Sequence, residues 1–151
     1  MTLVHHLNCG FLQAPPNPRV GCHCLLLEDP RGLGLVDTGI GLQDVRQPLQ
    51  RIGQPLIDLA GFQFNEADTA VRQIERLGYR PSDVTHVALT HGDPGSRWRL
   101  GGLSCRHVHV AEEELANIRR VLLALGDVAV VHDGRAGRLR KPRTQLCEHK
   151  L

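Results

Sequence analysis

The chain has 151 residues, of which 41% are hydrophobic and 23% charged, and its formal net charge is +2. This composition predicts one soluble globular domain with its own hydrophobic core, and it excludes an intrinsically disordered chain. Aromatic residues make up only 3%, which argues against a surface that stacks nucleic-acid bases. No apolar run approaches the roughly 20 residues of a membrane-spanning helix.

The N-terminal third of the chain is typical of strands joined by turns. Residues 3–7 and 20–28 are apolar enough for strands, and a proline-rich loop separates them. In residues 29–32, proline stands second and glycine fourth, which favours a hairpin into a third strand over residues 33–36. The sequence therefore predicts a small antiparallel unit at the start of the domain.

Helices are predicted in the middle of the chain. A weaker one is expected over residues 42–52, and the clearest one over residues 66–77. The stripe of apolar residues at helical spacing in the latter comprises Ala67, Ala70, Val71, Ile74 and Leu77. Asn65 can cap its N-terminus, Gly78 follows its C-terminus, and Pro81 prevents its continuation.

A second set of strands and helices follows. Residues 83–90 are predicted to form a buried strand, residues 106–110 another strand, and residues 112–125 a helix. The alternation predicts an α/β layered domain. The expected core comprises Leu25, Leu27, Leu35, Val71, Ile74, Leu77, Val87 and Leu89.

The C-terminal segment differs in charge. Residues 133–151 carry six Lys or Arg against two acidic residues. We therefore expect a domain over residues 1–126 and a basic, poorly ordered tail over residues 127–151. Nucleic-acid binding through this tail is the less favoured alternative.

The cysteines and the N-terminal histidines are predicted to be structural. The five cysteines are irregularly spaced, which argues against a disulfide framework and favours a reducing cytoplasm. The N-terminus shows no pattern of a secretory signal. On a strand, Cys22 and Cys24 would share one face and His23 the other, so the three cannot converge on one ion. We expect buried cysteines, and packed or edge-strand histidines at His5, His6 and His23.

His91 is a better candidate for chemistry. It follows a buried strand directly, and functional groups of α/β folds gather at the carboxyl ends of strands. Asp93 stands two residues further on, within reach of the same ion. Five segments of the chain carry a resemblance to a known family: residues 5–10, 22–26, 36–39, 74–78 and 81–91. Together they resemble the metallo-β-lactamase superfamily, in a lactonase-like branch.

The resemblance implies a metallo-β-lactamase-like αββα layered fold, of which this chain would provide the N-terminal half only. It also implies zinc as cofactor and a lactone, thioester or similar ester as small-molecule substrate. Zinc ligands in the family lie in a His-x-His-x-Asp-His motif and lower the pKa of a bound water. By resemblance His91 and Asp93 would be metal ligands, and Asp37 would steady the site without binding the ion.

The motif departs from the family's pattern after Asp93. Gly95 stands where the family has Asp, and Ser96 where it has the last His, so neither is a normal zinc ligand. Read one base out of frame with suitable codons, residues 93–104 begin Thr-Pro-Asp-His, which is similar to the family motif. Residues 92–107 are therefore interpreted as a frame-shifted stretch, and a divergent loop is the alternative.

The sequence is compatible with three functions, each of a different class. The first is a zinc-dependent hydrolase, here expected to be inactive because the motif is broken and the family's second half is missing. The second is a non-catalytic fragment that binds no metal. The third is a small binding module that uses the basic tail on an acidic partner. No membrane association is expected, whereas an exposed sheet face could support self-association.

Overall fold

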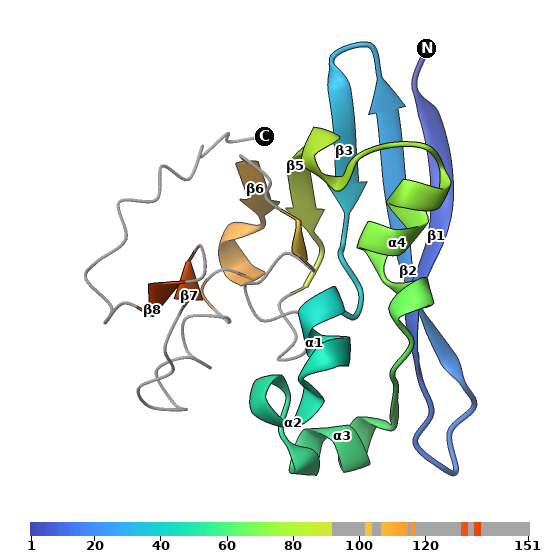
Figure 1. Ribbon diagram of the computed structural model, residues 1–151, viewed down its shortest axis with the longest axis vertical. Helices are drawn as coiled ribbons and strands as arrows, with labels where there is room; N and C mark the ends of the chain where they lie inside the picture. The colour runs from blue at the N-terminus through green and yellow to red at the C-terminus, as the bar shows by residue number, and fades with distance from the viewer. Residues whose placement is uncertain (92–101, 104–106, 115, 117–130, 133–134, 137–151) are drawn as a thin grey trace.

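The computed structural model describes residues 1–91, 102–103, 107–114, 116, 131–132 and 135–136. Its main feature is a six-stranded mixed sheet with the strand order β4-β1-β2-β3-β5-β6 (Figure 1). The strands are β1 (Leu3–Leu12), β2 (Val20–Asp29), β3 (Gly32–Val36), β4 (Phe62–Gln63), β5 (Val84–Leu89) and β6 (His107–Val110). β1, β2 and β3 pair antiparallel, whereas β5 and β6 extend the sheet in parallel from β3. The predicted α/β class is confirmed.

The predicted strands and hairpin are present, with one strand longer than expected. The turn at residues 29–32 joins β2 to β3 in an antiparallel pair, as its proline and glycine indicate. β1 continues past Leu7 to Leu12, because its far end pairs with both β2 and the short β4. The partner β4 has only two residues, so periodicity could not have revealed it.

The connection from β3 to β5 contains all the complete helices of the described residues. They are α1 (Leu42–Arg46), α2 (Pro48–Arg51), α3 (Gln54–Ala60) and α4 (Ala70–Arg76), with single 3₁₀ turns η1 (Glu66–Asp68) and η2 (Pro81–Asp83). The single helix predicted over residues 42–52 is wrong: the chain breaks at Gln47, and Pro48 begins a new helix. Proline has no backbone N–H to donate to the preceding turn, so it fits the first position of α2 instead.

The helix predicted over residues 66–77 is shorter than expected. Asn65 accepts a hydrogen bond from the backbone N–H of Ala67, but it caps only the 3₁₀ turn. The backbone is extended at Thr69, whose hydroxyl accepts the N–H of Arg72 at 3.5 Å and so caps α4. The apolar stripe predicted one helix, but the second cap at Thr69 divides the segment into a 3₁₀ turn and α4.

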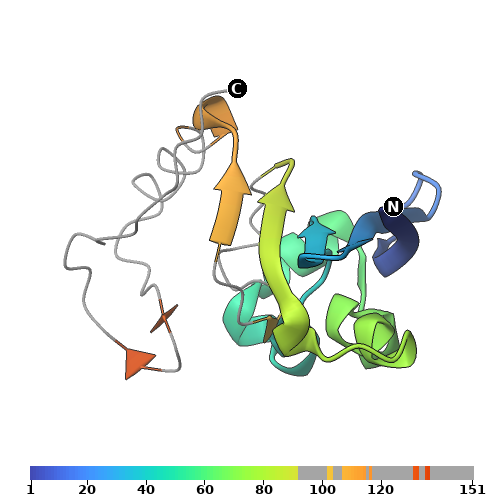
Figure 2. The same ribbon diagram turned by 90° about the horizontal axis from the view of Figure 1, so that it is seen from above.

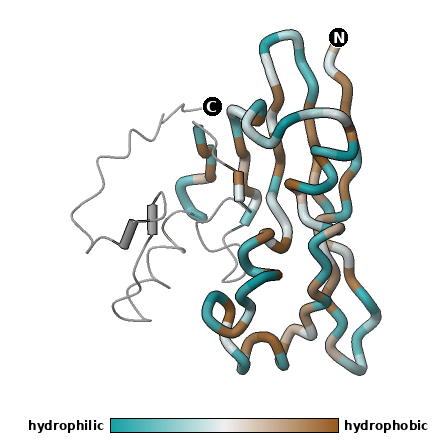
Figure 3. Tube along the Cα trace, in the orientation of Figure 1, coloured by the Kyte–Doolittle hydropathy of each residue, from teal (hydrophilic) through white to brown (hydrophobic). Residues whose placement is uncertain are grey.

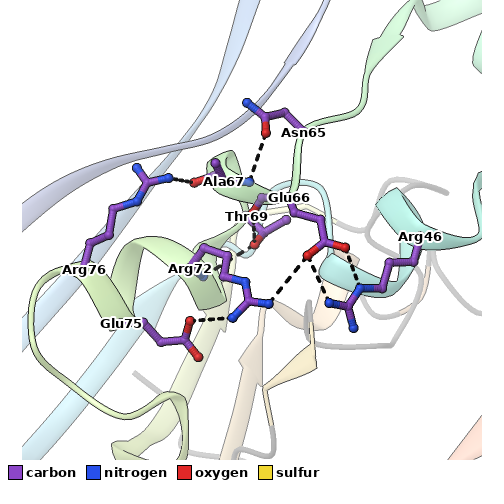
Figure 4. Close-up of polar contacts among 8 residues, drawn as sticks. All are labelled: Arg46, Asn65, Glu66, Ala67, Thr69, Arg72, Glu75 and Arg76. Carbon is purple, nitrogen blue, oxygen red and sulfur yellow. Dashed lines mark hydrogen bonds and ion pairs between the residues drawn. The ribbon is translucent and has the colours of Figure 1, made fainter.

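Ion pairs hold these helices together at the surface (Figure 4). The guanidinium of Arg46 in α1 donates to both carboxylate oxygens of Glu66, at 2.6 and 3.0 Å. Arg72 of α4 lies 3.6 Å from the same carboxylate and also pairs with Glu75 at 2.8 Å. A more buried pair, Arg51 with Asp44 at 2.5 Å, joins α2 to α1.

One face of the sheet, the covered face, packs against α4 and forms the core. Its fully or nearly buried residues are Leu7, Cys9, Cys24, Leu26, Leu33, Leu35, Val84 and Val87, joined by Ala70, Val71 and Ile74 of α4. In Figure 2 the bright green helix α4 lies to one side of the strands. Figure 3 shows hydrophobic residues concentrated along the strands and polar ones at the turn between β2 and β3.

The predicted core is half right. Burial is confirmed for Leu35, Val71, Ile74 and Val87. Leu89 is only half-buried but packs against the core as predicted. Burial is wrong for Leu25 and Leu27, which are half-buried, and for Leu77, which is 41% exposed. In β2 the residues that face the core are Cys24 and Leu26, so the alternate leucines point to the other side. Leu77 is the C-cap of α4, where the chain leaves the sheet.

The opposite side of the sheet is called the open face here. Its residues are exposed or half-buried: Val4, His6, His23, Leu25, Leu27, Val36, His86, Ala88, His107 and His109. Alternation along paired strands places them together, because side chains at successive positions point to opposite faces. The same strands therefore present an aliphatic core on one side and a mixture of aliphatic and imidazole groups on the other.

Much of the C-terminal part lies outside the described residues. Residues 112–114 and 116 are helical, in the region predicted as a helix over residues 112–125. Within the basic tail, β7 (Val131–His132) pairs antiparallel with β8 (Arg135–Ala136). The domain boundary at residue 126 stays a prediction. In the part of the chain that the structure describes, no helix is long and apolar enough to cross a membrane.

Candidate functional site

The loop that follows β3 is fixed tightly against β1. The backbone N–H of Ile40 donates to the carbonyl of Cys9 at 2.8 Å. Gly39 has a φ of +58°, and a Cβ there would lie 2.2 Å from the same carbonyl oxygen. Only glycine permits this close approach. The loop therefore has one position relative to the sheet, and Asp37 at its start is placed with it.

Asp37 and His91 meet because β3 and β5 are parallel neighbours. Their carboxyl ends lie at the same edge of the sheet, and the N–H of Asp37 donates to the carbonyl of Ala88 at 2.8 Å, continuing the ladder. Asp37 itself has a positive φ of 58°, which is unusual for a residue other than glycine. This backbone directs the Asp37 carboxylate toward the end of β5.

Thr90 connects the two side chains. Its backbone N–H donates to one carboxylate oxygen of Asp37 at 2.9 Å, and its hydroxyl donates to the other at 2.6 Å. The hydroxyl oxygen also lies 2.9 Å from Nδ1 of His91, and Asp37 lies 4.0 Å from the same nitrogen. The three residues form a continuous hydrogen-bonded chain from β3 to His91.

This chain selects the tautomer of His91. The Thr90 hydroxyl has one proton and gives it to Asp37, so toward His91 its oxygen can only accept. Nδ1 of a neutral His91 therefore carries the ring proton, and Nε2 carries the lone pair. A histidine with its Nδ1–H held in this way is arranged as metal-binding histidines commonly are. The His91 side chain is 55% exposed, so it is accessible from solvent.

The prediction of buried cysteines is confirmed for Cys24 but not for Cys22. Cys9 and Cys24 are buried on neighbouring strands, and Cys22 is half-buried while His23 is exposed. A hydrogen bond with Cys9, burial and the negative charge of Asp37 all raise the pKa of the Cys24 thiol far above its ordinary value. This thiol stays protonated and is a poor metal ligand.

Asp93, the second predicted ligand, lies outside the described residues, as do Gly95 and Ser96. The structure therefore brings Asp37 together with His91 and leaves the other predicted positions untested. Among the described residues, no group of three or more His, Cys, Asp or Glu side chains is arranged to hold a metal ion. Taken alone, these residues do not make up a catalytic zinc centre.

Sequence reasoning missed two features. Thr90 was assigned only to a strand, although a hydroxyl directly before His91 is the signal that could have revealed it. Histidines of distant segments also come together: His6 with His23, and His86 with His107 and His109. The His-x-His spacing of residues 107 and 109 was a usable signal, because such residues share one face of a strand.

Comparison with known proteins gives a consistent family. The sequence model of the Metallo-beta-lactamase superfamily matches residues 17–133. Probable metallo-hydrolases of Mycobacterium tuberculosis and Mycobacterium bovis are each 45% identical to the chain over 111 residues. The match covers 74% of this chain and 35% of each relative, so the chain spans about a third of the length of these curated relatives.

Solved structures agree at the level of the fold. A Bacillus thuringiensis AiiA variant, with N-decanoyl-L-homoserine bound at its active site, superposes with a TM-score of 0.52 and 22% identity. The superposition covers 75% of this chain and 50% of that one. The hydrolase AbOPH of the beta-lactamase superfamily gives 0.51 at 15% identity, over 76% of this chain and 43% of that one. At these identities the likeness shows a shared fold.

Proposed function

The chain belongs to the metallo-β-lactamase superfamily, and from this we propose that it derives from a zinc-dependent hydrolase of a lactone, thioester or similar ester. We further propose that the chain in its present form does not catalyse that hydrolysis. The observation that carries the first proposal is the Asp37–Thr90–His91 chain at the carboxyl ends of β3 and β5. Functional groups of α/β folds gather at this edge of a sheet.

Each residue of this chain has a distinct role in the proposal. His91 would offer Nε2 to a zinc ion, because its Nδ1 is held by the Thr90 hydroxyl. Asp37 is a positioning residue that acts through Thr90. Its carboxylate accepts both Thr90 bonds, and its own side chain is only 17% exposed. Removal of a residue that holds a metal ligand in place typically weakens metal affinity by about 10–100-fold.

The proposed inactivity depends on the number of ligands. A catalytic zinc ion needs about three protein ligands and an open position for water. His91 and Asp93 would provide two, and neither glycine at residue 95 nor serine at residue 96 replaces the ligand that the family has there. The described residues do not complete the set, so we derive no catalytic step through zinc.

Zinc titration and a lactonase assay of two forms test the proposal. The unmodified chain should bind zinc weakly and show no turnover. The Gly95→Asp, Ser96→His double variant should bind zinc more tightly but remain of low activity. Turnover by the unmodified chain that is lost in His91→Ala would overturn the proposed inactivity.

The positioning role of Asp37 needs a separate readout. In the double variant, Asp37→Asn should weaken zinc binding, because the amide cannot accept both Thr90 bonds in the same way. His5→Gln, on another part of the sheet, is the matched control and should leave zinc binding unchanged. Equal zinc affinity of the double variant with and without Asp37→Asn would show that Asp37 does not act on His91.

A further inference from the structure

Among the residues that the structure describes, five histidines lie on the open face, and none of them belongs to the Asp37–Thr90–His91 chain. They are His6, His23, His86, His107 and His109, and all five are exposed. They form two groups. His6 and His23 meet across β1 and β2, and the other three meet across β5 and β6. Exposed imidazoles of this kind can be reached by ions from solvent.

The register of β5 and β6 explains the larger group. His86 is paired with His107, and Ala88 with His109, so all three imidazoles project from the same face of adjacent parallel strands. The ring centre of His86 lies 4.7 Å from that of His107 and 5.3 Å from that of His109. Nδ1 of His86 and Nε2 of His109 are 3.0 Å apart, so these two nitrogens face each other.

This spacing suits two neighbouring ligands of one metal ion. With metal–nitrogen bonds of about 2.0–2.1 Å, nitrogens at this separation subtend an angle of roughly 90–100°. That angle matches the square-planar or tetragonal geometry of Cu²⁺ and Ni²⁺ more closely than the tetrahedral geometry of Zn²⁺. Imidazole is also a preferred ligand of these ions.

We propose that His86 and His109 form a chelating site for a divalent ion of the Cu²⁺ or Ni²⁺ type, with His107 as a third ligand after a rotation of its side chain. The ion takes the place of the proton between the two facing nitrogens. When both rings are neutral, one of the two facing nitrogens carries this proton. The proton exchanges with solvent and the same ring is protonated at its other nitrogen instead. Two metal–nitrogen bonds form, and the neutral pair releases no net proton.

A neutral ring is the form that binds metal. Bound metal would also tie β6 to β5 at the edge of the sheet. Because the unfolded chain lacks this arrangement, the ion should stabilise the folded state and raise its melting temperature.

The test is a titration of the chain with CuCl₂, followed through the histidine ring signals in NMR spectra. Paramagnetic Cu²⁺ broadens the rings that bind it, and the signals of residues 86, 107 and 109 should broaden first. His86→Gln and His109→Gln should each weaken the apparent affinity by about tenfold or more, which corresponds to about 1.4 kcal/mol. Both positions are exposed, and thermal melts without metal should show that the variants remain folded.

Two controls separate this site from others. His23→Gln removes the pair on β1 and β2, which has the same 3.0 Å spacing but no third imidazole among the described residues, and should leave the first binding event unchanged. His91→Ala removes the candidate ligand of the proposed function, and it should also leave the first binding event at the β5–β6 site unchanged. Broadening that begins at His91 or His6, or a titration unaffected by His86→Gln, would overturn the proposal.

Discussion

The two faces of the sheet are made by the same strands and have opposite characters. On the covered face, Leu26 and Leu35 are almost completely buried beneath α4. One position away along β2, Leu25 and Leu27 are only half-buried on the open face. Burial of apolar area contributes about 25 cal/mol per Å², so the covered face contributes most of the stability. The open face presents exposed imidazoles, which can bind ions, and half-buried apolar side chains, which can contact another apolar surface.

The largest difference between the faces should appear in the unfolding free energy. Ile74 of α4 is completely buried against the covered face. Ile74→Ala should destabilise the chain by about 2–5 kcal/mol in urea unfolding, because it removes buried methyl groups and leaves a cavity. Leu77→Ala is the control, since Leu77 is 41% exposed, and its cost should be much smaller. Equal costs would contradict the assignment of the core.

The loop after β3 should also be sensitive to a single methyl group. Gly39→Ala should cost about 1–2 kcal/mol for the positive φ, with overpacking against Cys9 adding about 1–3 kcal/mol. Gly78→Ala is a matched control: φ is +89°, but its Cβ would meet nothing within 4 Å. Because both glycines have a positive φ, the difference between the two unfolding free energies measures chiefly the close approach. No difference would show that this loop moves away from β1.

The two faces of the sheet also show what the sequence could predict. The strands β1, β2, β3, β5 and β6, the hairpin and the α/β class followed from local pattern and turn residues. Local pattern did not predict which side of β2 faces the core, because Cys24 and residues 25–27 are all apolar and fit either side. Only the register with β1 and β3 decides it.

The candidate site shows the same limit. The position of His91 after a strand, and the resemblance of residues 36–39 to a known family, were visible in the sequence. The contact of Asp37 with Thr90 depends on the parallel pairing of β3 with β5, across 53 residues of chain. The histidine group of β5 and β6 depends on register in the same way. Contacts between distant strands are not encoded in local periodicity.

Self-association is expected through the open face. Apolar residues such as Leu25 and Val36 are partly exposed there, and exposed apolar patches favour association. Leu27→Lys should reduce both self-association in analytical ultracentrifugation and binding of a hydrophobic dye. Leu59→Lys is the control, because Leu59 is 75% exposed on α3 and lies outside this face. A wild-type chain that stays monomeric at high concentration would contradict this expectation.

The smallest expected effect is a shift in the titration of His86 on the open face. Desolvation, then the charges of His107, His109 and Arg31, lower its pKa from the ordinary value of 6.5. The unfolded chain therefore binds more protons than the folded chain between the folded pKa and 6.5, so stability falls as the pH decreases through this window. An NMR titration of the His86 ring should give a pKa below 6.5.

Variants of the neighbouring residues identify the cause of this shift. His107→Gln and His109→Gln should each raise the pKa of His86, because each removes a positive charge that would oppose its protonation. His23→Gln, on the same face but on β2, should leave the titration of His86 unchanged. A pKa of His86 that does not respond to either neighbouring substitution would leave desolvation and the charge of Arg31 as its causes. It would also show that the three imidazoles do not interact, and so would contradict their close arrangement on the open face.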